Sequence, residues 1–440
     1  MSRPVAAMLC VCASLLAAPR AQDLLPKAPP QARPVLLKNA VLHTVTGGVV
    51  LGGSLWFADG VIGEVLPAGT QPKLPAGAEP LELDLGGKHV FPGLISAQTT
   101  LGLVEIGRVR QSVDLDELGE LSPEAVAAVA VNPDSAAIPV ARSNGVLTAC
   151  TFPRGGLLPG RASVIRLDGW TNAEMTVRAD AGVVVAWPAE RPRSSTRRGR
   201  GDDGEDATAR ARQRIEDAFA AARAWLDART ADATVALDVR HAALVEALRG
   251  EVPVLLLADE QEQIESAVRW ATDRGLRAVV VGGGDADRCA DLLRERRVPV
   301  VLGGVHRLPR RDDSPYDEAF TLPARLAALG VRFCIATGDD FSNDRNLPYH
   351  AATAAAHGLG EARALAAITQ DAADILGVGD RLGSLTAGKE ATLFVADGHP
   401  FELSTAVELA FVQGRQIDLR NKQTELARKY RERYRQLQAR

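Results

Sequence analysis

Residues 252–281 read VPVLLLADEQEQIESAVRWATDRGLRAVVV, and this stretch decides the fold class. Two short apolar runs, at 252–257 and 278–281, flank a segment in which apolar residues recur at i, i+3, i+4 and i+7 from Ile264. Gly275 follows that segment as a helix stop. Runs without polar alternation are typical of strands buried on both faces of a parallel sheet. The stretch therefore predicts a strand, a helix over 260–274 and a second strand parallel to the first.

The same alternation extends in both directions along the chain. Further apolar runs begin at His89, Gly145, Val298 and Arg332, with helical segments between them. Repeated alternation over about 290 residues predicts an α/β fold, and its length suits a (β/α)8 TIM-like barrel over residues 91–383. Residues 35–90 and 384–419 instead show short apolar runs separated by turn signals. We expect these two segments to join in one small composite β-sandwich domain.

Composition excludes several classes of protein. The 440 residues are 46% hydrophobic and 24% charged, which is ordinary for a globular chain and excludes disorder and a polytopic membrane protein. A formal net charge of −4 gives no global field that would attract nucleic acid. The basic residues are distributed unevenly, because only seven are Lys and none of these lies between positions 89 and 388.

The ends of the chain carry separate signals. Residues 1–21 combine Arg3 with an apolar run and small residues, which predicts a signal peptide and export to the periplasm or the exterior. Residues 22–34 read as a linker, and 190–209 as a polar loop insertion in the barrel. Residues 420–440 predict a helix whose narrow apolar stripe packs on the body of the protein. After signal removal, three cysteines remain in apolar surroundings and are expected to be buried thiols: Cys150, Cys289 and Cys334.

Three stretches together resemble the amidohydrolase superfamily, in its imidazolonepropionase-like branch. Phe91-Pro-Gly-Leu-Ile-Ser-Ala-Gln-Thr-Thr-Leu-Gly-Leu is similar to the first barrel strand, where the family has His-x-His. Ala336-Thr-Gly-Asp-Asp is similar to the last barrel strand, and Arg381 to Val395 to the return into the composite domain. The resemblance implies a divalent metal such as Zn²⁺ that activates water, small-molecule substrates and a homodimer.

The chain departs from the family's metal-binding pattern at most positions. Gln98 and Thr100 stand where the resemblance places the two histidines of the first strand. Leu257 stands at the position of the fifth-strand His, and the sixth strand ends in glycines. The lack of Lys from 89 to 388 excludes a carbamylated Lys in the barrel. The metal motif is therefore degenerate, and the residues themselves predict no metal ligand.

Five residues are candidates for a functional site. Asp339 matches the last-strand Asp of the family and is the catalytic candidate, with a hydrogen-bonding role in its own loop as the alternative. Gln98, Thr100, His306 and Glu105 are expected to line the substrate cleft. For His306, a structural role in the turn before Pro309 stays open.

Asp259 lies at a strand end, but its spacing to Glu262 favours a role as a helix N-cap. Two functions stay open on these residues. One is hydrolysis of non-peptide C–N bonds in small cyclic amides or amidines, implied by the resemblance. The other is a non-catalytic ligand-binding or envelope-associated protein, in which polar groups at the barrel mouth hold a ligand. Neither involves nucleic acid or a membrane span.

Overall fold

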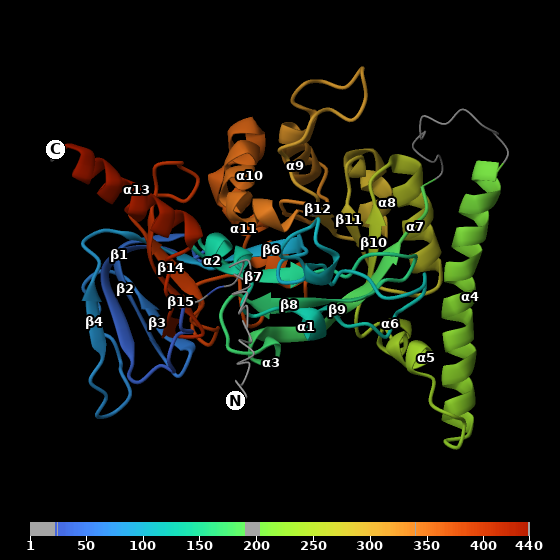
Figure 1. Ribbon diagram of the computed structural model, residues 1–440, viewed down its shortest axis with the longest axis horizontal. Coiled ribbons are helices and arrows are strands. Elements are labelled where there is room, and N and C mark those ends of the chain that lie inside the picture. Colours follow the sequence, from blue (N-terminus) through green and yellow to red (C-terminus); the bar gives the residue numbers. More distant parts are fainter. Residues whose placement is uncertain (1–22, 24, 190–202, 339, 439–440) are drawn as a thin grey trace, which may run out of the picture.

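The computed structural model describes residues 23, 25–189, 203–338 and 340–438. Within these ranges the strands form two sheets of eight strands each. Figure 1 shows the sheet of terminal strands at one end of the molecule and the barrel sheet in the middle. The predicted fold class, a TIM-like barrel with a smaller β domain built from both ends of the chain, is confirmed.

The smaller sheet joins the two ends of the chain. Its strand order is β16-β15-β14-β5-β1-β2-β3, and β4 pairs with β1. The junction is the antiparallel pair β5–β14, in which Phe91 lies opposite Phe394. The strand bounds are β1 (Val35–His43), β2 (Val49–Ala58), β3 (Val61–Leu66), β4 (Leu81–Asp84), β5 (His89–Pro92), β14 (Leu393–Ala396), β15 (Val407–Val412) and β16 (Arg415–Gln416).

The barrel strands follow one another in sequence order around the second sheet. One of them, β8, runs antiparallel to both of its neighbours, and the other pairs are parallel. The physical reason is that only short connections flank β8, and a parallel connection needs a crossover of a dozen residues or more. The bounds are β6 (Leu94–Thr99), β7 (Val146–Thr151), β8 (Gly160–Arg166), β9 (Thr176–Ala186), β10 (Val254–Ala258), β11 (Ala278–Gly282), β12 (Val300–Leu302) and β13 (Phe333–Ile335).

Most helices cover the outside of the barrel (Figure 1). Between β6 and β10 lie η1 (Arg110–Ser112), α1 (Ala127–Ala130), α2 (Ala137–Arg142), α3 (Asn172–Met175), α4 (Asp203–Ala231), α5 (Val239–Ala243) and α6 (Val245–Leu248). Later helices are α7 (Gln261–Asp273), η2 (Ala286–Cys289), α8 (Ala290–Glu295), α9 (Glu318–Ala328), η3 (Phe341–Asn346), α10 (Leu347–Ala354), η4 (Ala355–Leu359), α11 (Glu361–Ala367), α12 (Gln370–Ile375) and α13 (Lys422–Gln438).

The barrel interior is a packed apolar core. Alternate residues of its strands, such as Ile95, Cys150 and Leu255, form one cluster with Ala372 and Leu376 from the α12 region. In TIM-like barrels, binding sites lie outside such a core, at the carboxyl ends of the strands. The three cysteines of the described chain are free and buried, as expected.

Two expectations about local structure were wrong. The segment predicted as a polar loop over 190–209 is helical from Asp203 onward, where α4 begins, and 190–202 lie outside the described residues. The C-terminal helix α13 forms, but it buries none of its residues, so its apolar stripe is not packed on the body. Four large apolar residues in 17 give too narrow a face to hold a long polar helix against the barrel.

The predicted signal peptide, residues 1–21, also lies outside the described residues. Part of the predicted linker is anchored, because Asp23 and Lys27 are buried and their side chains lie 3.0 Å apart. Asp23 also accepts a hydrogen bond from buried Arg142, which in turn pairs with Asp168. Among the described helices, none is long and apolar enough to cross a membrane.

Candidate ligand site at the barrel mouth

A cavity of 480 Å³ lies at the carboxyl ends of the barrel strands, and we call it the mouth cavity. Five strands supply residues to it or to the loops that follow them, which is where barrel enzymes place their sites. Its lining combines glycines, apolar side chains, one amide, one carboxylate and two guanidinium groups. The lining residues are Gln98, Asp259, Gly282, Gly284, Leu302, Gly303, Gly304, Val305, Arg307, Leu308, Pro309, Arg310, Ala319, Leu322 and Gly338.

Gln98 enters the cavity because β6 contains a bulge. Ser96 pairs with Ala149 of β7, whereas Thr99 pairs with Thr151, so three steps on β6 match two steps on β7. In a regular strand, residues three apart face opposite sides, but the extra residue places Ser96 and Thr99 on one face. Gln98 lies between them and lines the cavity.

Glycines let the loops at the mouth pack closely. Gly282 ends β11 with φ of +107°, and a Cβ there would lie 2.8 Å from Oδ1 of Asp259. Gly338 has φ of +98°, and a Cβ there would lie 2.7 Å from the carbonyl oxygen of Gly303. Both positions require a left-handed backbone and space that a side chain would fill. The carboxyl ends of β11, β12 and β13 therefore present backbone to the cavity.

The charged groups of the mouth form one connected cluster. Asp259 accepts a hydrogen bond from the backbone N–H of Gly284 at 3.2 Å, and its Oδ1 lies 3.4 Å from Nη1 of Arg310. Arg310 also lies 4.0 Å from buried Asp285. Burial raises the pKa of Asp285, but hydrogen bonds from Arg311 and the charges of both arginines outweigh it and hold that pKa below its usual value. The cluster fixes a guanidinium and a half-exposed carboxylate side by side.

Asp259 reaches the mouth because it does not cap the following helix. The N-cap of α7 is Glu260, and Gln263 is the residue three positions on. The Gln263 side chain accepts hydrogen bonds from the backbone N–H groups of Asp259 and Glu260, at 2.9 and 3.4 Å. The expectation of an Asp259 cap was therefore wrong by one residue, and the Asp259 carboxylate remains available to the cavity.

Among the candidates that the structure describes, Thr100, Glu105 and His306 do not line the mouth cavity. Thr100 is buried beyond the end of β6, and Glu105 lines a different cavity with Arg345 and Lys422. The Glu105 carboxylate accepts hydrogen bonds from Asn132 and from the backbone N–H of residue 136, and burial raises its pKa. Asp339 lies outside the described residues.

His306 contacts helix α10. Its Nε2 lies 2.8 Å from the hydroxyl of Thr353, and its ring lies 4.0 Å from the ring of His350. His350 is buried, and its Nδ1 accepts a hydrogen bond from the backbone N–H of Val305. Burial lowers the pKa of His350 to about 3, so this ring is a neutral acceptor. His306 and His350 therefore hold the loop after β12 against helix α10.

Sequence reasoning missed Asp344, which has no exposed surface. Its carboxylate accepts hydrogen bonds from Ser96 at 2.7 Å, Thr99 at 2.5 Å and Thr337 at 3.0 Å. These donors come from β6 and from the residues after β13, the two end strands of the barrel sheet. Burial raises the pKa of Asp344 to about 6, against the effect of the three hydroxyls. Asp344 therefore joins the two edges at the barrel seam.

The described residues of the mouth do not fit a divalent metal ion of the superfamily's kind. Catalytic zinc sites use about three protein ligands, mostly His, Asp, Glu or Cys. In the described ranges, no group of three or more such side chains is arranged to hold a metal ion. Leu257, at the position of the fifth-strand ligand, packs against the apolar cluster inside the barrel. Among the described residues that line the cavity, the side chains that could donate to a metal are a neutral amide and one carboxylate.

Comparisons with known proteins agree with this architecture. The amidohydrolase family model matches residues 259–419. An amidohydrolase from Thermotoga maritima is 25% identical, with a TM-score of 0.75 over 88% of this chain and 100% of that one. A molinate hydrolase is 15% identical, with a TM-score of 0.54 over 90% and 96% of the two chains. A putative prolidase from Bifidobacterium longum is 18% identical, with a TM-score of 0.52 over 88% and 95%.

No curated protein matches the chain. The two neighbours below 25% identity share the fold alone, whereas the Thermotoga structure and the family model add similarity in sequence. Both kinds of similarity agree with a barrel joined to a composite sheet. The chain therefore resembles the amidohydrolase superfamily in its fold and matches the amidohydrolase family over residues 259–419.

Proposed function

We propose that this protein binds a small polar molecule in the mouth cavity and does not carry out metal-assisted hydrolysis. The observation that carries the proposal is that Gln98, Leu257 and Gly282 stand at the ends of three barrel strands, where the resemblance to the superfamily places metal ligands. An alkyl side chain and a glycine supply no metal donor, and an amide oxygen is a weak ligand for zinc.

The mouth cavity has the properties of a recognition site. Its volume of 480 Å³ falls within the usual range for small-molecule pockets. The lining contains the amide of Gln98 and the carboxylate of Asp259, and Arg307 and Arg310 supply charged donors. Leu302 and Leu322 supply apolar surface beside them. Such a lining suits a molecule that combines a carboxylate or amide with a small apolar part.

Hydrolysis is the second candidate function, because the family match and the fold support a hydrolase-like protein. Among the described lining residues, the half-exposed Asp259 carboxylate is the candidate general base. The substrates would be small cyclic amides or amidines, as the resemblance implies. The two candidates differ in whether Asp259 only holds the bound molecule or also accepts a proton from water.

One experiment separates the two functions. Purified protein is equilibrated with Zn²⁺ or Mn²⁺, desalted and assayed for bound metal, and a panel of cyclic amides, ureas and amino-acid derivatives is screened by thermal shift and for hydrolysis. We expect little bound metal, a stabilising compound that is recovered intact, and loss of stabilisation in Gln98→Ala. Glu105→Gln is the control, since it changes a polar residue outside the mouth cavity. Stoichiometric metal with hydrolysis that Asp259→Asn abolishes would overturn the proposal.

We propose also that the protein is exported, on the pattern of residues 1–21. Cleavage before Asp23 would keep the buried contacts of Asp23 and Lys27. N-terminal sequencing of the protein purified from a culture supernatant or periplasm tests this. Recovery of intact chain, with Met1 or Ser2 first, only from the cytoplasm would refute it.

A further inference from the structure

Helix α13 extends from the body of the molecule and carries an uncovered apolar stripe. In Figure 1 it leads away from the small sheet to the C-terminus. Its apolar residues follow one another at helical spacing and are 42, 47, 59 and 52% exposed: Leu426, Tyr430, Tyr434 and Leu437. Tyr residues that remain open to solvent on a surface helix are typical of protein contact surfaces.

The charge of α13 is opposite to that of the rest of the chain. The helix holds six Lys or Arg and two Glu, so its charge is +4 on a chain of −4. Arg428 pairs with Glu425, and Arg435 pairs with Glu432. In the described part of the chain, Lys429 and Arg433 form no ion pair. Lys429 lies three residues after Leu426, and Arg433 lies seven residues after it. Both are therefore on the same face of the helix as the apolar stripe.

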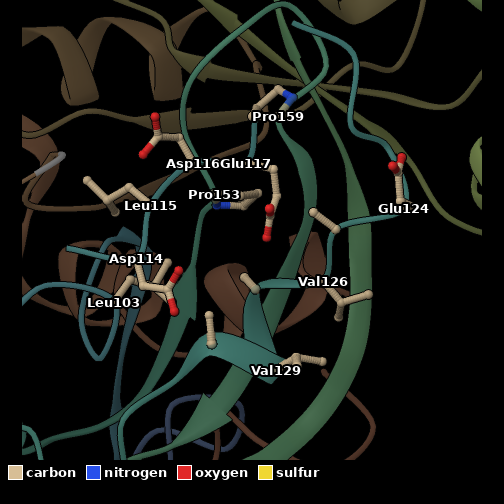
Figure 2. A pocket seen from close by; sticks show the side chains of 13 residues that line it. Leu103, Asp114, Leu115, Asp116, Glu117, Glu124, Val126, Val129, Pro153 and Pro159 are labelled. Carbon is tan, nitrogen blue, oxygen red and sulfur yellow. The ribbon is translucent and has the colours of Figure 1, made fainter. Parts of the chain in front are cut away.

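A second surface has the complementary character, and we call it the acidic pocket. It is a cavity of 370 Å³ between the β6–β7 connection and the start of β8, shown in Figure 2. Its walls are apolar and its edge carries carboxylates. The lining residues are Leu103, Asp114, Leu115, Asp116, Glu117, Glu124, Ala125, Val126, Ala127, Val129, Ala130, Pro153 and Pro159.

Two carboxylates of the acidic pocket are available to a partner. Asp116 pairs with Arg110 at 3.1 Å, and Glu124 pairs with Arg240 at 3.3 Å. Across the described ranges, Asp114 and Glu117 take part in no ion pair. Figure 2 shows both of these carboxylates directed into the space that the lining residues enclose. A cationic group with an aromatic or aliphatic neighbour would satisfy both the carboxylates and the apolar walls.

We propose that α13 of one copy of this chain docks in the acidic pocket of a second copy. The contact is of the helix-in-groove kind, with Tyr430 and Tyr434 on the apolar walls and Lys429 and Arg433 facing Asp114 and Glu117. An exchange of helices in both directions gives a closed, two-fold dimer. The proposal is independent of what the mouth cavity binds.

The composition of the stripe favours this partner over a membrane surface. Helices that lie in the lipid interface present a broad face of Trp, Phe and Leu. The stripe of α13 is one side chain wide, and two of its four apolar residues are tyrosines. Pairing of α13 with another α13 is disfavoured, because each carries +4. The acidic pocket of the same chain carries carboxylates without ion-pair partners in the described residues, so its charge is opposite to that of α13.

Sedimentation velocity of the full chain, over a hundredfold range of concentration and at low and high salt, tests the proposal. We expect a dimer that weakens in salt, and Tyr430→Ala with Tyr434→Ala to weaken it about 100-fold, as for two buried contact residues. Tyr316→Ala is the matched control, because Tyr316 is 80% exposed outside both surfaces.

Charge exchange identifies the partner surface. The pairs Lys429→Glu with Arg433→Glu, and Asp114→Lys with Glu117→Lys, are each expected to abolish the dimer, and all four changes in one chain to restore it. A chain that stays monomeric at every concentration would overturn the proposal, as would a dimer that the tyrosine variant leaves intact. A monomer that binds anionic phosphatidylserine vesicles through the two tyrosines would also overturn it, in favour of a membrane surface.

Discussion

Removal of the Asp344 carboxylate is expected to open the barrel seam. Three hydroxyls donate to it from the two end strands of the barrel sheet or the residues that follow them. Hydrogen bonds to a charged acceptor contribute about 1.5–3 kcal/mol each, and the cost of burying the charge offsets part of the total. Asp344→Ala should therefore lower the free energy of unfolding by about 3–5 kcal/mol. Asp344→Asn keeps one acceptor oxygen and should cost about 1–2 kcal/mol at pH 7.

The free energy of unfolding that is lost in the Asp344 variants should depend on pH, and the raised pKa of Asp344 sets the direction of that dependence. The pKa of Asp344 is about 6 in the folded chain, above the usual 3.8. The folded state therefore binds a proton more readily than the unfolded state, and this contribution to stability grows as the pH falls through 6 and disappears as it rises. Between pH 7 and pH 4.5 the native protein gains about 2 kcal/mol that Asp344→Asn does not.

Urea denaturation of the native protein and both variants at pH 7 and pH 4.5, followed by tryptophan fluorescence, measures these differences. Comparison at each pH cancels the titration of every other group. Asp340→Asn is the control, since Asp340 is exposed and accepts hydrogen bonds from Ser342 and Asn343 of the η3 helix that it begins and, among the described residues, from neither end strand of the barrel sheet. A loss below 1 kcal/mol in Asp344→Ala, or a difference between native protein and Asp344→Asn that shrinks on acidification, would refute this account of the seam.

Three further predictions concern two buried side chains and one glycine of the mouth cavity. Burial lowers the pKa of His43 to about 4 from 6.5, so its neutral form contributes stability above pH 6.5 that is lost towards pH 4. His43→Gln should remove about 3 kcal/mol of that acid sensitivity, seen as a flatter profile of melting temperature against pH. Arg142→Ala leaves the buried carboxylates of Asp23 and Asp168 short of a partner and should cost about 3–5 kcal/mol in urea denaturation, where a cost under 1 kcal/mol contradicts the network. Gly338→Ala forces a side chain into a left-handed backbone at the mouth, and should weaken ligand binding by calorimetry without changing the mass of the dimer.

The positions of individual strands and helices along the chain could be predicted from the sequence. The apolar runs at 252–257 and 278–281 became β10 and β11, and the helix predicted over 260–274 became α7. Such predictions succeed because the period of apolar residues and the helix stop are local properties. The antiparallel course of β8 was not predicted, because the direction of a strand depends on the length of its connections and on its partners.

The residues of the mouth cavity could be predicted from the sequence only in part. Gln98 was expected at the mouth and lies there, whereas Asp259 was expected to cap α7 and lines the cavity instead. The choice between Asp259 and Glu260 as the cap is a shift of one residue, which no spacing rule resolves. Asp344 had no signal in the sequence, because two of its three donors are more than 240 positions away on β6.

The sequence by itself determined the barrel, the composite sheet and the replacement of family ligand positions by Gln98, Thr100 and Leu257, since each depends on residue type along the chain. Only the tertiary structure decided which of these side chains reach the mouth. A single extra residue in β6 directs Gln98 into the cavity while Ser96 and Thr99 hold the seam. The physical reason is that a one-residue shift in a strand reverses the face of every side chain beyond it, and pairing with β7 sets that shift.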